Sequence, residues 1–500
     1  MSVKVLTNAE MRETEQLAIK AGYPSLLLME HAAGALVDVL EKELNGCRGK
    51  HVLFLCGKGN NGGDGLAAAR LFRDRGGEPV VFLTEESCTD DSRTNLRLAY
   101  LAEIPVVIAA GGDPEEQLQP YRPDGGWDGF VDALYGTGFS GRTDELTERL
   151  TLLPLYQERQ VPVIAADVPS GLNALTGECG GCMMKADVTV TFHAVKPGLV
   201  LTKERDRVGR IAVKDIGLEH LDEEIVPNNE TVILAEGCDL LLPERGKVCH
   251  KGDMGRLLIY AGSPGMAGAA AICARAAVKA GAGLTTLMCP GEMIPILQTL
   301  VPCAMCRSTE EAKRNMPAFD VLCLGCGLGQ QEETWQNVLQ IWDAEKPSVW
   351  DADALNLLAR HPMHLGELAV ITPHIGEAAR LLNETAEAVF SDRIGAAERL
   401  RKRFGCQVVL KSDVTVVKRE EQTVLIDCAS PALAKGGSGD ALCGILGALL
   451  AQDAPDPCVN GPLWHALASR VGAEKYGVAE LTAEELILCL HDAEKRYMKA

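Results

Sequence analysis

The sequence has few aromatic residues, a deficit of positive charge and no long hydrophobic run. Aromatic side chains make up 4% of the 500 residues, whereas 51 residues are glycine, which indicates close backbone packing and many turns. The net charge of −20 disfavours nucleic acids and anionic membranes as partners, because both bind to basic surfaces. No apolar stretch reaches the roughly 18 residues that a membrane-spanning helix needs, so no such helix is expected.

The chain also shows no feature of a secreted protein. Its first residues, MSVKVLTNAEMRETEQ, are charged and contain no apolar core of the signal-peptide kind. The 18 cysteines are scattered through apolar runs, which is typical of reduced thiols, so a cytoplasmic protein is expected. Cys303, Cys306, Cys323 and Cys326 have the spacing of a four-cysteine zinc site. However, Cys323 and Cys326 lie in a predicted buried strand, where residues three apart point to opposite faces, so no metal is expected there.

The length exceeds what one hydrophobic core supports, so two or more domains are expected. A helical segment at 8–44, broken at 22–24, precedes short apolar strands that alternate with amphipathic helices. We expect strands at 51–56, 79–84, 106–109, 129–134, 161–166 and 186–192, and helices near 66–75, 93–102 and 145–160. Continuous hydrophobicity in such strands predicts a parallel sheet covered on both faces, that is, a doubly wound α/β domain.

A charged stretch at 217–230, GLEHLDEEIVPNNE, interrupts this pattern and is predicted to be a linker. The alternation then starts again, with strands expected at 256–261, 283–289, 320–324, 347–351, 369–372, 406–411, 414–417 and 423–426. The sequence therefore predicts two α/β domains in tandem.

In the first domain, the strand HVLFLCG leads into the loop GKGNNGGDG. Gly57, Gly59 and Gly62 satisfy the dinucleotide fingerprint, and Glu85 could bind the ribose, so a dehydrogenase is the first hypothesis. The fit is poor, because the amides, glycines and carboxylate of 60–64 suit sugar or amide groups or a hard cation better than a bare pyrophosphate. A Walker loop is excluded, since no Gly-Lys-Ser/Thr follows.

Two further strand ends would meet this loop in a parallel sheet. VDALYGTGFSGR and ADVPSGLNALTG carry Asp132 and Asp167, each followed by small residues that allow close contact with a ligand. Downstream, TFHAVKPG adds Lys196, for which a solvated loop lysine is the alternative interpretation.

In the second domain, AKGGSGDALCGILGALL places a glycine-dense turn directly before an apolar helix. Backbone N–H groups there can converge on an anion, and the helix dipole adds to the attraction. Asp440 would repel a phosphate unless it faces a hydroxyl group whose proton leaves as a phosphoryl group arrives. The alternative is an ordinary glycine turn with Asp440 as a charge at the helix start. His374 in TPHIGEAARLL could be a helix cap, and Lys411 in VVLKSDVTVV could meet phosphate.

Several first-domain motifs occur together in one known family. NNGGDG, VDALYGTGFSG, DVPSG and TFHAVKPG, preceded by PSLLLMEHAAG, resemble the YjeF-type amino-terminal domain of NAD(P)H-hydrate epimerases. The resemblance implies that the following residues bind the hydrated nicotinamide nucleotide: Asn60, Asn61, Gly62, Gly63, Asp64, Gly136, Thr137, Gly138, Phe139, Ser140, Gly141, Arg142 and Asp167. It further implies a potassium ion held by Asn61, Asp132 and Ser170. His31 departs from the family, which has Asn there. Asp167 and Lys196, titratable groups in adjacent motifs, are the hypothetical proton-transfer pair.

The second half resembles the ribokinase-like fold, and more closely the NAD(P)H-hydrate dehydratases. The resemblance implies that ADP with Mg²⁺, or ATP in relatives, phosphorylates the hydroxyl group of the hydrate, and that phosphate is then eliminated. It implies nucleotide contacts at Lys411, Ser412, Asp413, Val414, Thr415 and Gly439, and hydrate contacts at Ala269, Gly327, His374 and Asp440. Asp440 would be the base, and the N–H groups of 437–439 would stabilise the transferred phosphoryl group.

Together these features predict a cytoplasmic bifunctional repair enzyme with domains at 1–220 and 225–500. The first domain would epimerise the R and S hydrates NADHX and NADPHX, and the second would dehydrate the S form with ADP, releasing phosphate and AMP. A homo-oligomer is expected. Two alternatives remain at this point: a sugar or vitamin kinase, which would leave a stable phosphorylated product, and a nucleotide sensor, which would bind hydrates without turnover.

Overall fold

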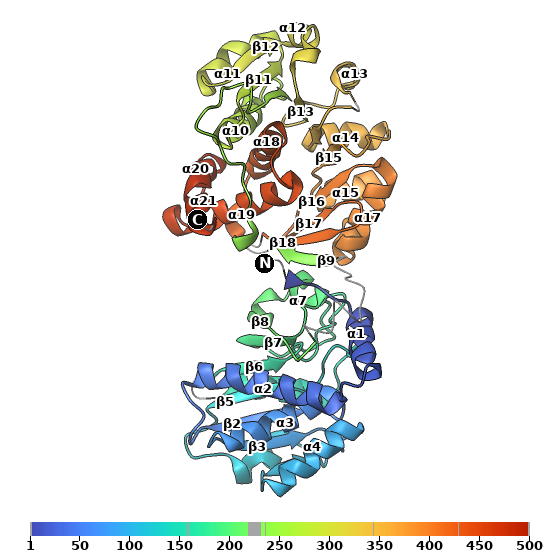
Figure 1. Cartoon of the computed structure of the whole chain (residues 1–500), viewed down its shortest axis with the longest axis vertical. Helices are drawn as coiled ribbons and strands as arrows, with labels where there is room; N and C mark the ends of the chain where they lie inside the picture. The colour runs from blue at the N-terminus through green and yellow to red at the C-terminus, as the bar shows by residue number, and fades with distance from the viewer. Residues whose placement is uncertain are drawn as a thin grey trace. The chain divides into compact units, whose positions relative to one another are not determined.

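The computed structural model describes residues 3–157, 160–218, 232–235, 237–343, 345–428 and 430–498 (Figure 1). It divides into two compact units, Lys4–Glu230 and Thr231–Ala500, the second of which also includes Met1–Val3. Most of the predicted linker, 219–230, lies outside the described residues. Within those ranges, none of the helices combines the length and the apolar character that crossing a membrane requires.

A seven-stranded parallel sheet forms the core of the first unit, in the order β4-β3-β2-β5-β6-β7-β8. Its strands are β2 His51–Cys56, β3 Glu78–Leu83, β4 Val106–Ile108, β5 Gly129–Ala133, β6 Val163–Ala166, β7 Val188–Phe192 and β8 Arg210–Lys214. The predicted doubly wound α/β layer is therefore confirmed. The edge strand β8 was not predicted, because it is only partly buried and begins and ends with a charged residue.

The helices of the first unit are α1 Asn8–Lys20, α2 Ser25–Leu44, α3 Asn60–Asp74, α4 Asp90–Leu101, α5 Pro114–Leu118, α6 Glu145–Leu152, α7 Pro197–Leu201 and α8 Arg205–Val208. The break predicted at 22–24 is present between α1 and α2. The prediction that helix 145–160 is continuous is wrong, because α6 ends at Leu152 and a 3-10 turn with an early proline, Leu153–Tyr156, follows.

The polar segment 60–64 is the first turn of α3, whereas the sequence predicted a loop that ends before 66. Glycine permits this early start, because the turn lies directly against the end of the sheet. A Cβ atom at Gly62 would lie 1.7 Å from the carbonyl oxygen of Gly57, and one at Gly65 would lie 2.7 Å from Sγ of Cys56. These two glycines are therefore required by packing between helix and strand.

An eleven-stranded sheet forms the core of the second unit, in the order β1-β9-β18-β17-β16-β15-β14-β13-β10-β11-β12. Its strands are β1 Val3–Lys4, β9 Val232–Ala235, β10 Arg256–Tyr260, β11 Leu284–Cys289, β12 Met305–Ser308, β13 Val321–Leu324, β14 Ser348–Trp350, β15 Ala369–Ile371, β16 Gln407–Leu410, β17 Val414–Lys418 and β18 Thr423–Asp427. Pairing is parallel from β12 to β16 and antiparallel between β16, β17 and β18. The second α/β domain is thus confirmed, with β1, β9 and β12 added to the predicted strands.

The helices of the second unit are α10 Ala267–Lys279, α11 Ile294–Leu300, α12 Thr309–Lys313, α13 Glu332–Ile341, α14 Ala352–Arg360, α15 Ile375–Leu382, α16 Ala386–Ser391, α17 Arg393–Phe404, α18 Ser438–Ala451, α19 Pro457–Tyr476, α20 Ala483–Leu488 and α21 Leu490–Tyr497. Helix α18 is almost entirely buried and packs closely on α10. A Cβ atom at Gly444 would lie 2.1 Å from the carbonyl oxygen of Cys273. This tight packing fixes the position of the glycine-dense turn at the start of α18.

Candidate active sites

The first candidate site lies where the strand order of the first sheet changes direction. Strand β2 has β3 on one side and β5 on the other, and ligands of doubly wound folds bind at the carboxyl ends of strands at such a point. The turns after β2 and β5 touch, because Gly57 N donates to Ala133 O at 2.9 Å. A Cβ atom at Gly57 would lie 2.0 Å from the carbonyl oxygen of Leu134. Gly57, one glycine of the fingerprint that suggested a dehydrogenase, is therefore required by the packing of the two turns.

Asp132 and Ser170, two of the predicted potassium ligands, are in direct contact. Both are fully buried, and the Ser170 hydroxyl donates to Asp132 Oδ1 at 2.5 Å while its backbone N–H donates to Oδ2 at 2.8 Å. Burial raises the pKa of Asp132 to about 6, although the hydrogen bonds from Ser170 oppose the rise. The buried carboxylate would be stabilised by a bound cation.

The third predicted potassium ligand, Asn61, packs against the turn after β5. A Cβ atom at Gly136 would lie 3.2 Å from Asn61 Cγ. The buried Nδ2 of Asn61 has no hydrogen-bond partner among the described residues. A carboxylate, a hydroxyl and a carboxamide are the oxygen donors that a hard cation prefers, so the residue types fit the predicted ion.

Asp167 and Lys196 form a buried ion pair at the ends of β6 and β7. Lys196 is fully buried, and its Nζ donates to Asp167 Oδ1 at 2.5 Å, to Thr191 Oγ1 at 3.1 Å and to Phe192 O at 2.9 Å. Asp167 Oδ1 also accepts from the Thr191 hydroxyl, whereas Oδ2 has no hydrogen bond within the described part of the chain. The alternative of a solvated loop lysine is therefore wrong, and one carboxylate oxygen remains available to a ligand.

Two further acids lie near this pair. Burial, followed by the charge of Asp167, raises the pKa of Asp64 well above its ordinary value and also raises that of Glu15. Glu15 comes from α1, which sequence reasoning did not connect with the site. The same helix reaches the GTGF turn, since Asn8 Nδ2 donates to Thr137 O at 2.5 Å.

The remaining predicted contacts of the first unit lie along two turns. Gly62 and Gly63 are buried in the first turn of α3. Beyond the GTG turn, the ring of Phe139 lies 5.1 Å from that of Tyr135. Three residues at the end of this segment are exposed, namely Ser140, Gly141 and Arg142.

The second candidate site is built around Lys411, which directly follows β16. Its Nζ donates to Asp351 Oδ1 at 2.6 Å, and a Cβ atom at Gly439 would lie 3.3 Å from the same nitrogen. Burial alone would lower the pKa of Lys411, but the carboxylates of Asp351 and Glu377 raise it overall, so the ammonium group stays charged. Asp351 is 2% exposed and was missed by sequence reasoning, although it stands at a strand end in WDADAL.

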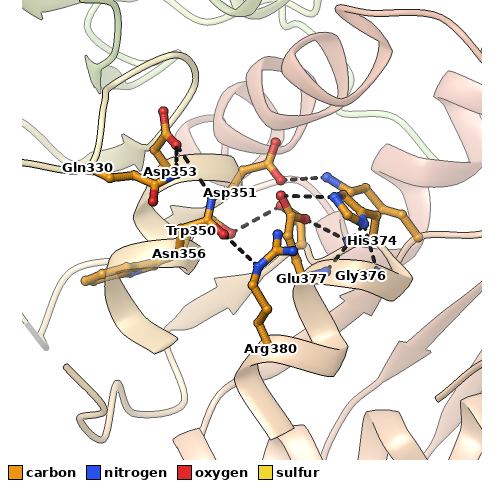
Figure 2. Close-up of polar contacts among 11 residues, drawn as sticks. Gln330, Trp350, Asp351, Asp353, Asn356, His374, Gly376, Glu377 and Arg380 are labelled. Atoms are coloured by element: carbon orange, nitrogen blue, oxygen red, sulfur yellow. Dashed lines mark hydrogen bonds and ion pairs between the residues drawn. The ribbon is translucent and has the colours of Figure 1, made fainter. Parts of the chain in front are cut away.

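His374 caps α15, as the alternative interpretation had it. Its Nδ1 accepts from Gly376 N at 3.0 Å and from Glu377 N at 3.4 Å, and the backbone N–H of His374 donates to Glu377 Oε2 at 2.8 Å (Figure 2). Burial, and then the charges of Lys411 and Arg380, lower the pKa of His374, so the ring is neutral. Burial raises the pKa of Glu377 to about 6. The His374 side chain is about half exposed and remains open to a ligand.

Asp440 lies in the first turn of α18 and is half-buried. Burial raises its pKa, the charge of Asp351 adds to the rise, and a hydrogen bond with the Cys326 thiol and the charge of Lys411 oppose it. Buried His465 fixes the start of this helix, because its Nε2 contacts the Ser438 carbonyl oxygen at 3.1 Å. Asp440, Asp351 and Lys411 thus share one electrostatic environment beside the helix N-terminus.

Only some of the other residues predicted to contact ligands in the second unit have accessible side chains. Gly327 has a φ of 59°, and a Cβ atom there would lie 3.0 Å from that of Ala269, so these two residues adjoin. Asp413 pairs with buried Arg393 at 2.6 Å, and Ser412 Oγ donates to Val414 O. Two residues of this segment, Val414 and Thr415, are buried in β17, so the turn exposes only Lys411, Ser412 and Asp413.

A second acid of the WDADAL segment, Asp353, ties the turn after β13 to α14. Gln330 Nε2 donates to its Oδ1 and Gly329 N to its Oδ2, both at 2.8 Å, and Arg380 reaches Asn356 at 3.0 Å (Figure 2). These bonds fix the loop that carries Gly327 relative to the helix that carries His374.

The cysteines that have the spacing of a zinc site differ in their exposure to solvent. Cys303 is exposed, whereas Cys323 and Cys326 are buried. The expectation that Cys323 and Cys326 point to opposite faces is wrong, because both contact Cys443 on α18. Strand β13 ends at Leu324, so the following glycine turn redirects Cys326.

Comparison with known proteins assigns both units. A model of the YjeF-related protein N-terminus matches 25–198, and a model described as NAD(P)H-hydrate dehydratase matches 257–491. The bifunctional NAD(P)H-hydrate repair enzyme Nnr of Escherichia coli is 38% identical over 88% of this chain and 84% of its own length. The chain belongs to the family of bifunctional NAD(P)H-hydrate repair enzymes. The Moorella thermoacetica repair enzyme is 35% identical over 97% of this chain and 95% of its own length.

Solved structures also resemble the second unit. One is the ADP/ATP-dependent NAD(P)H-hydrate dehydratase from Bacillus subtilis, co-crystallised with ATP and Mg²⁺. It is 29% identical, with a TM-score of 0.47, over 51% of this chain and 95% of its own length. Another, a ribokinase-like superfamily protein from Enterococcus faecalis, is 23% identical, with a TM-score of 0.49, over 54% of this chain and 98% of its own length.

Proposed function

We propose that this member of the repair enzyme family epimerises NADHX and NADPHX in residues 1–220 and dehydrates the S hydrates in residues 225–500. Family membership and two separate groups of ionisable residues, each at the carboxyl end of a mainly parallel sheet, support the proposal. Fusion is chemically useful, because the first domain would convert the unusable epimer into the substrate of the second. We place the enzyme in the cytoplasm and expect a homo-oligomer.

In the epimerase domain, Asp167 and Lys196 would be the proton-transfer pair. The Lys196 ammonium group is hydrogen-bonded to Oδ1, and Oδ2 would exchange a proton with the hydrate. The surrounding substrate contacts would come from Asn60–Asp64 in the first turn of α3 and from the turn 136–142. Asn61, Asp132 and Ser170 would hold a potassium ion, which would supply positive charge beside the substrate.

In the dehydratase domain, Asp440 would accept the proton of the hydrate hydroxyl as the oxygen attacks the terminal phosphorus of ADP. The bond from that phosphorus to the bridging oxygen breaks, and AMP leaves. Lys411 and the N–H groups of 437–439 would stabilise the charge on the transferred phosphoryl group. Phosphate, a far better leaving group than hydroxide, then departs to restore the reduced nicotinamide. Mg²⁺ would accompany ADP and neutralise phosphate charge.

The remaining assignments follow the same geometry. We assign Ser412, Asp413, Val414, Thr415 and Gly439 to nucleotide binding, where the buried positions of β17 would contribute backbone groups. Ala269, Gly327 and His374 would contact the hydrate.

One experiment tests both activities. A mixture of R and S hydrates is incubated with ADP, and the recovery of reduced-nicotinamide absorbance is followed together with phosphate and AMP release. We expect complete recovery of absorbance with one phosphate and one AMP per nicotinamide. A persistent phosphorylated product would instead favour a small-molecule kinase, and binding without turnover would favour a sensor.

A further inference from the structure

A compact thiol cluster lies beneath Asp440. Cys273 comes from α10, Cys326 from the turn after β13 and Cys443 from α18, and their sulfur atoms all lie within 4.8 Å of one another. Each of the three is at most 1% exposed. Among the described residues, this is the one group of three or more His, Cys, Asp or Glu side chains whose ligand atoms lie close enough together to share a metal ion. The residue roles proposed above for the two activities make no use of it.

The spacing of the sulfur atoms suits a metal ion. Tetrahedral coordination at a Zn–S distance of 2.3 Å requires sulfur atoms about 3.8 Å apart, so only a small contraction of the cluster is needed. The three elements that carry the thiols are held rigidly, because α10 and α18 pack at Gly444 with no room for a side chain. Preorganised thiols on separate, packed elements are how structural metal sites are built.

The fourth ligand would come from the active site. Asp440, half-buried in the first turn of α18 three residues before Cys443, is the acid whose charge acts on the Cys326 thiol; its carboxylate lies outside the group of atoms within 4.8 Å and would turn toward the cluster to bind an ion. Contacts among the three thiols and burial raise the pKa of each well above its ordinary value, so a metal ion must displace their protons when it binds. Gly325 and Gly327, both with positive φ, flank Cys326 and leave the turn without side chains on either side of it.

We propose that Cys273, Cys326 and Cys443 bind a thiophilic divalent cation of the zinc type, and that the Asp440 side chain turns toward the ion as the fourth ligand. The three S–H protons pass to solvent as three metal–sulfur bonds form, and no redox change is involved. Because ligation takes Asp440 away from the hydrate, the bound ion switches off dehydration. That consequence rests on the function proposed for Asp440, whereas the metal site itself does not.

Cadmium provides a spectroscopic test of binding. The purified full-length chain is titrated with Cd²⁺, and the ultraviolet thiolate-to-metal charge-transfer absorption is followed. Wild type, Cys273→Ala and Cys443→Ala are compared with Cys458→Ala, a fully buried cysteine outside the cluster. We expect wild type and the Cys458 variant to bind one tight equivalent more than the other two. Equal binding by all four proteins would overturn the site, because exposed cysteines would then account for the signal. Serine replacements at 273 and 443 repeat the comparison if the alanine variants do not fold.

Activity measurements distinguish metal binding from the proposed inhibition of dehydration. With the extra Cd²⁺ bound, we expect dehydration by wild type to fall at least tenfold, while epimerisation by the same molecules is unchanged. A dithiol chelator, which leaves Mg²⁺ in place, should restore it, and Cys273→Ala should resist inhibition. If Cd²⁺ binds as expected but dehydration persists, the proposed ligation by Asp440 is wrong. If metal-free enzyme does not dehydrate hydrates at all, the proposed function fails and the binding result still stands.

Discussion

Replacing Lys196 by Met tests whether the buried ion pair of the first domain is structural, catalytic or both. Lys196 donates three hydrogen bonds inside the protein, so its loss would leave the Asp167 carboxyl group, 13% of whose side chain is exposed, without its main partner. Removing one member of a buried pair costs about 3–5 kcal/mol. At about 2–4 °C per kcal/mol for a domain of this size, the melting temperature of the first domain should fall by roughly 6–20 °C.

The double variant Lys196→Met with Asp167→Asn separates the two roles. Because it removes both charges, it should be more stable than the sum of the single changes predicts, by about 1–3 kcal/mol of coupling. Its conversion of R to S hydrate, measured by chromatographic separation of the epimers, should remain lost. If both single variants epimerise at the wild-type rate, the pair does not transfer the proton. If the double variant shows no coupling in stability, the electrostatic reasoning is wrong as well.

Three further predictions concern other positions. Asp440→Asn should lower dehydration about a hundredfold or more with nucleotide binding kept, as loss of a general base requires; near-normal turnover would discard the assignment. Burial raises the pKa of Asp132 from 3.8 to about 6, so the folded protein binds this proton more tightly than the unfolded chain does. Protonation of Asp132 therefore adds about 3 kcal/mol to the stability at low pH, and this contribution is lost as pH rises through 6. Potassium should therefore raise the melting temperature of the first domain more at pH 8 than at pH 5, with sodium at equal ionic strength as control, and Asp132→Asn should abolish the difference. Gly62→Ala should destabilise the first domain by several kcal/mol, because its Cβ would clash with the Gly57 backbone, whereas Gly59→Ala, with open space, should cost about 1 kcal/mol or less; equal effects would contradict the packing argument.

The sequence predicted the centre of each sheet better than its edges. Central strands such as β2 and β10 are buried on both faces, so their apolar runs are continuous and easily recognised. The edge strands β8 and β12 are only partly buried and carry charged residues, so they have no such signature. The start of α3 was misplaced because glycine and asparagine usually mark loops, whereas here the glycines allow the helix to touch the strand ends.

The same limit applies to the candidate sites. Asp132 and Asp167 could be predicted because an acid at the end of an apolar strand, followed by small residues, is typical of ligand-contact turns. Asp351 has a similar position, but the helix that begins directly after it makes it resemble an ordinary cap. Glu15 could not be found, because only the tertiary fold brings α1 to the end of β6. A local pattern identifies strand ends, but it does not identify what a distant helix adds to them.

The two domains use a buried lysine–aspartate pair in different ways. In the first, Lys196 is fully buried and its ammonium group donates three hydrogen bonds to protein groups. It can therefore act on a substrate only through Oδ2 of Asp167. In the second, the Lys411 side chain is 18% exposed, and the buried partner Asp351 leaves its ammonium group beside Gly439. The first pair thus presents a carboxylate, which suits proton exchange, and the second presents a cation, which suits a phosphoryl group. The more exposed partner of each pair is therefore the one that the proposed function assigns to the substrate, namely Asp167 in the first domain and Lys411 in the second.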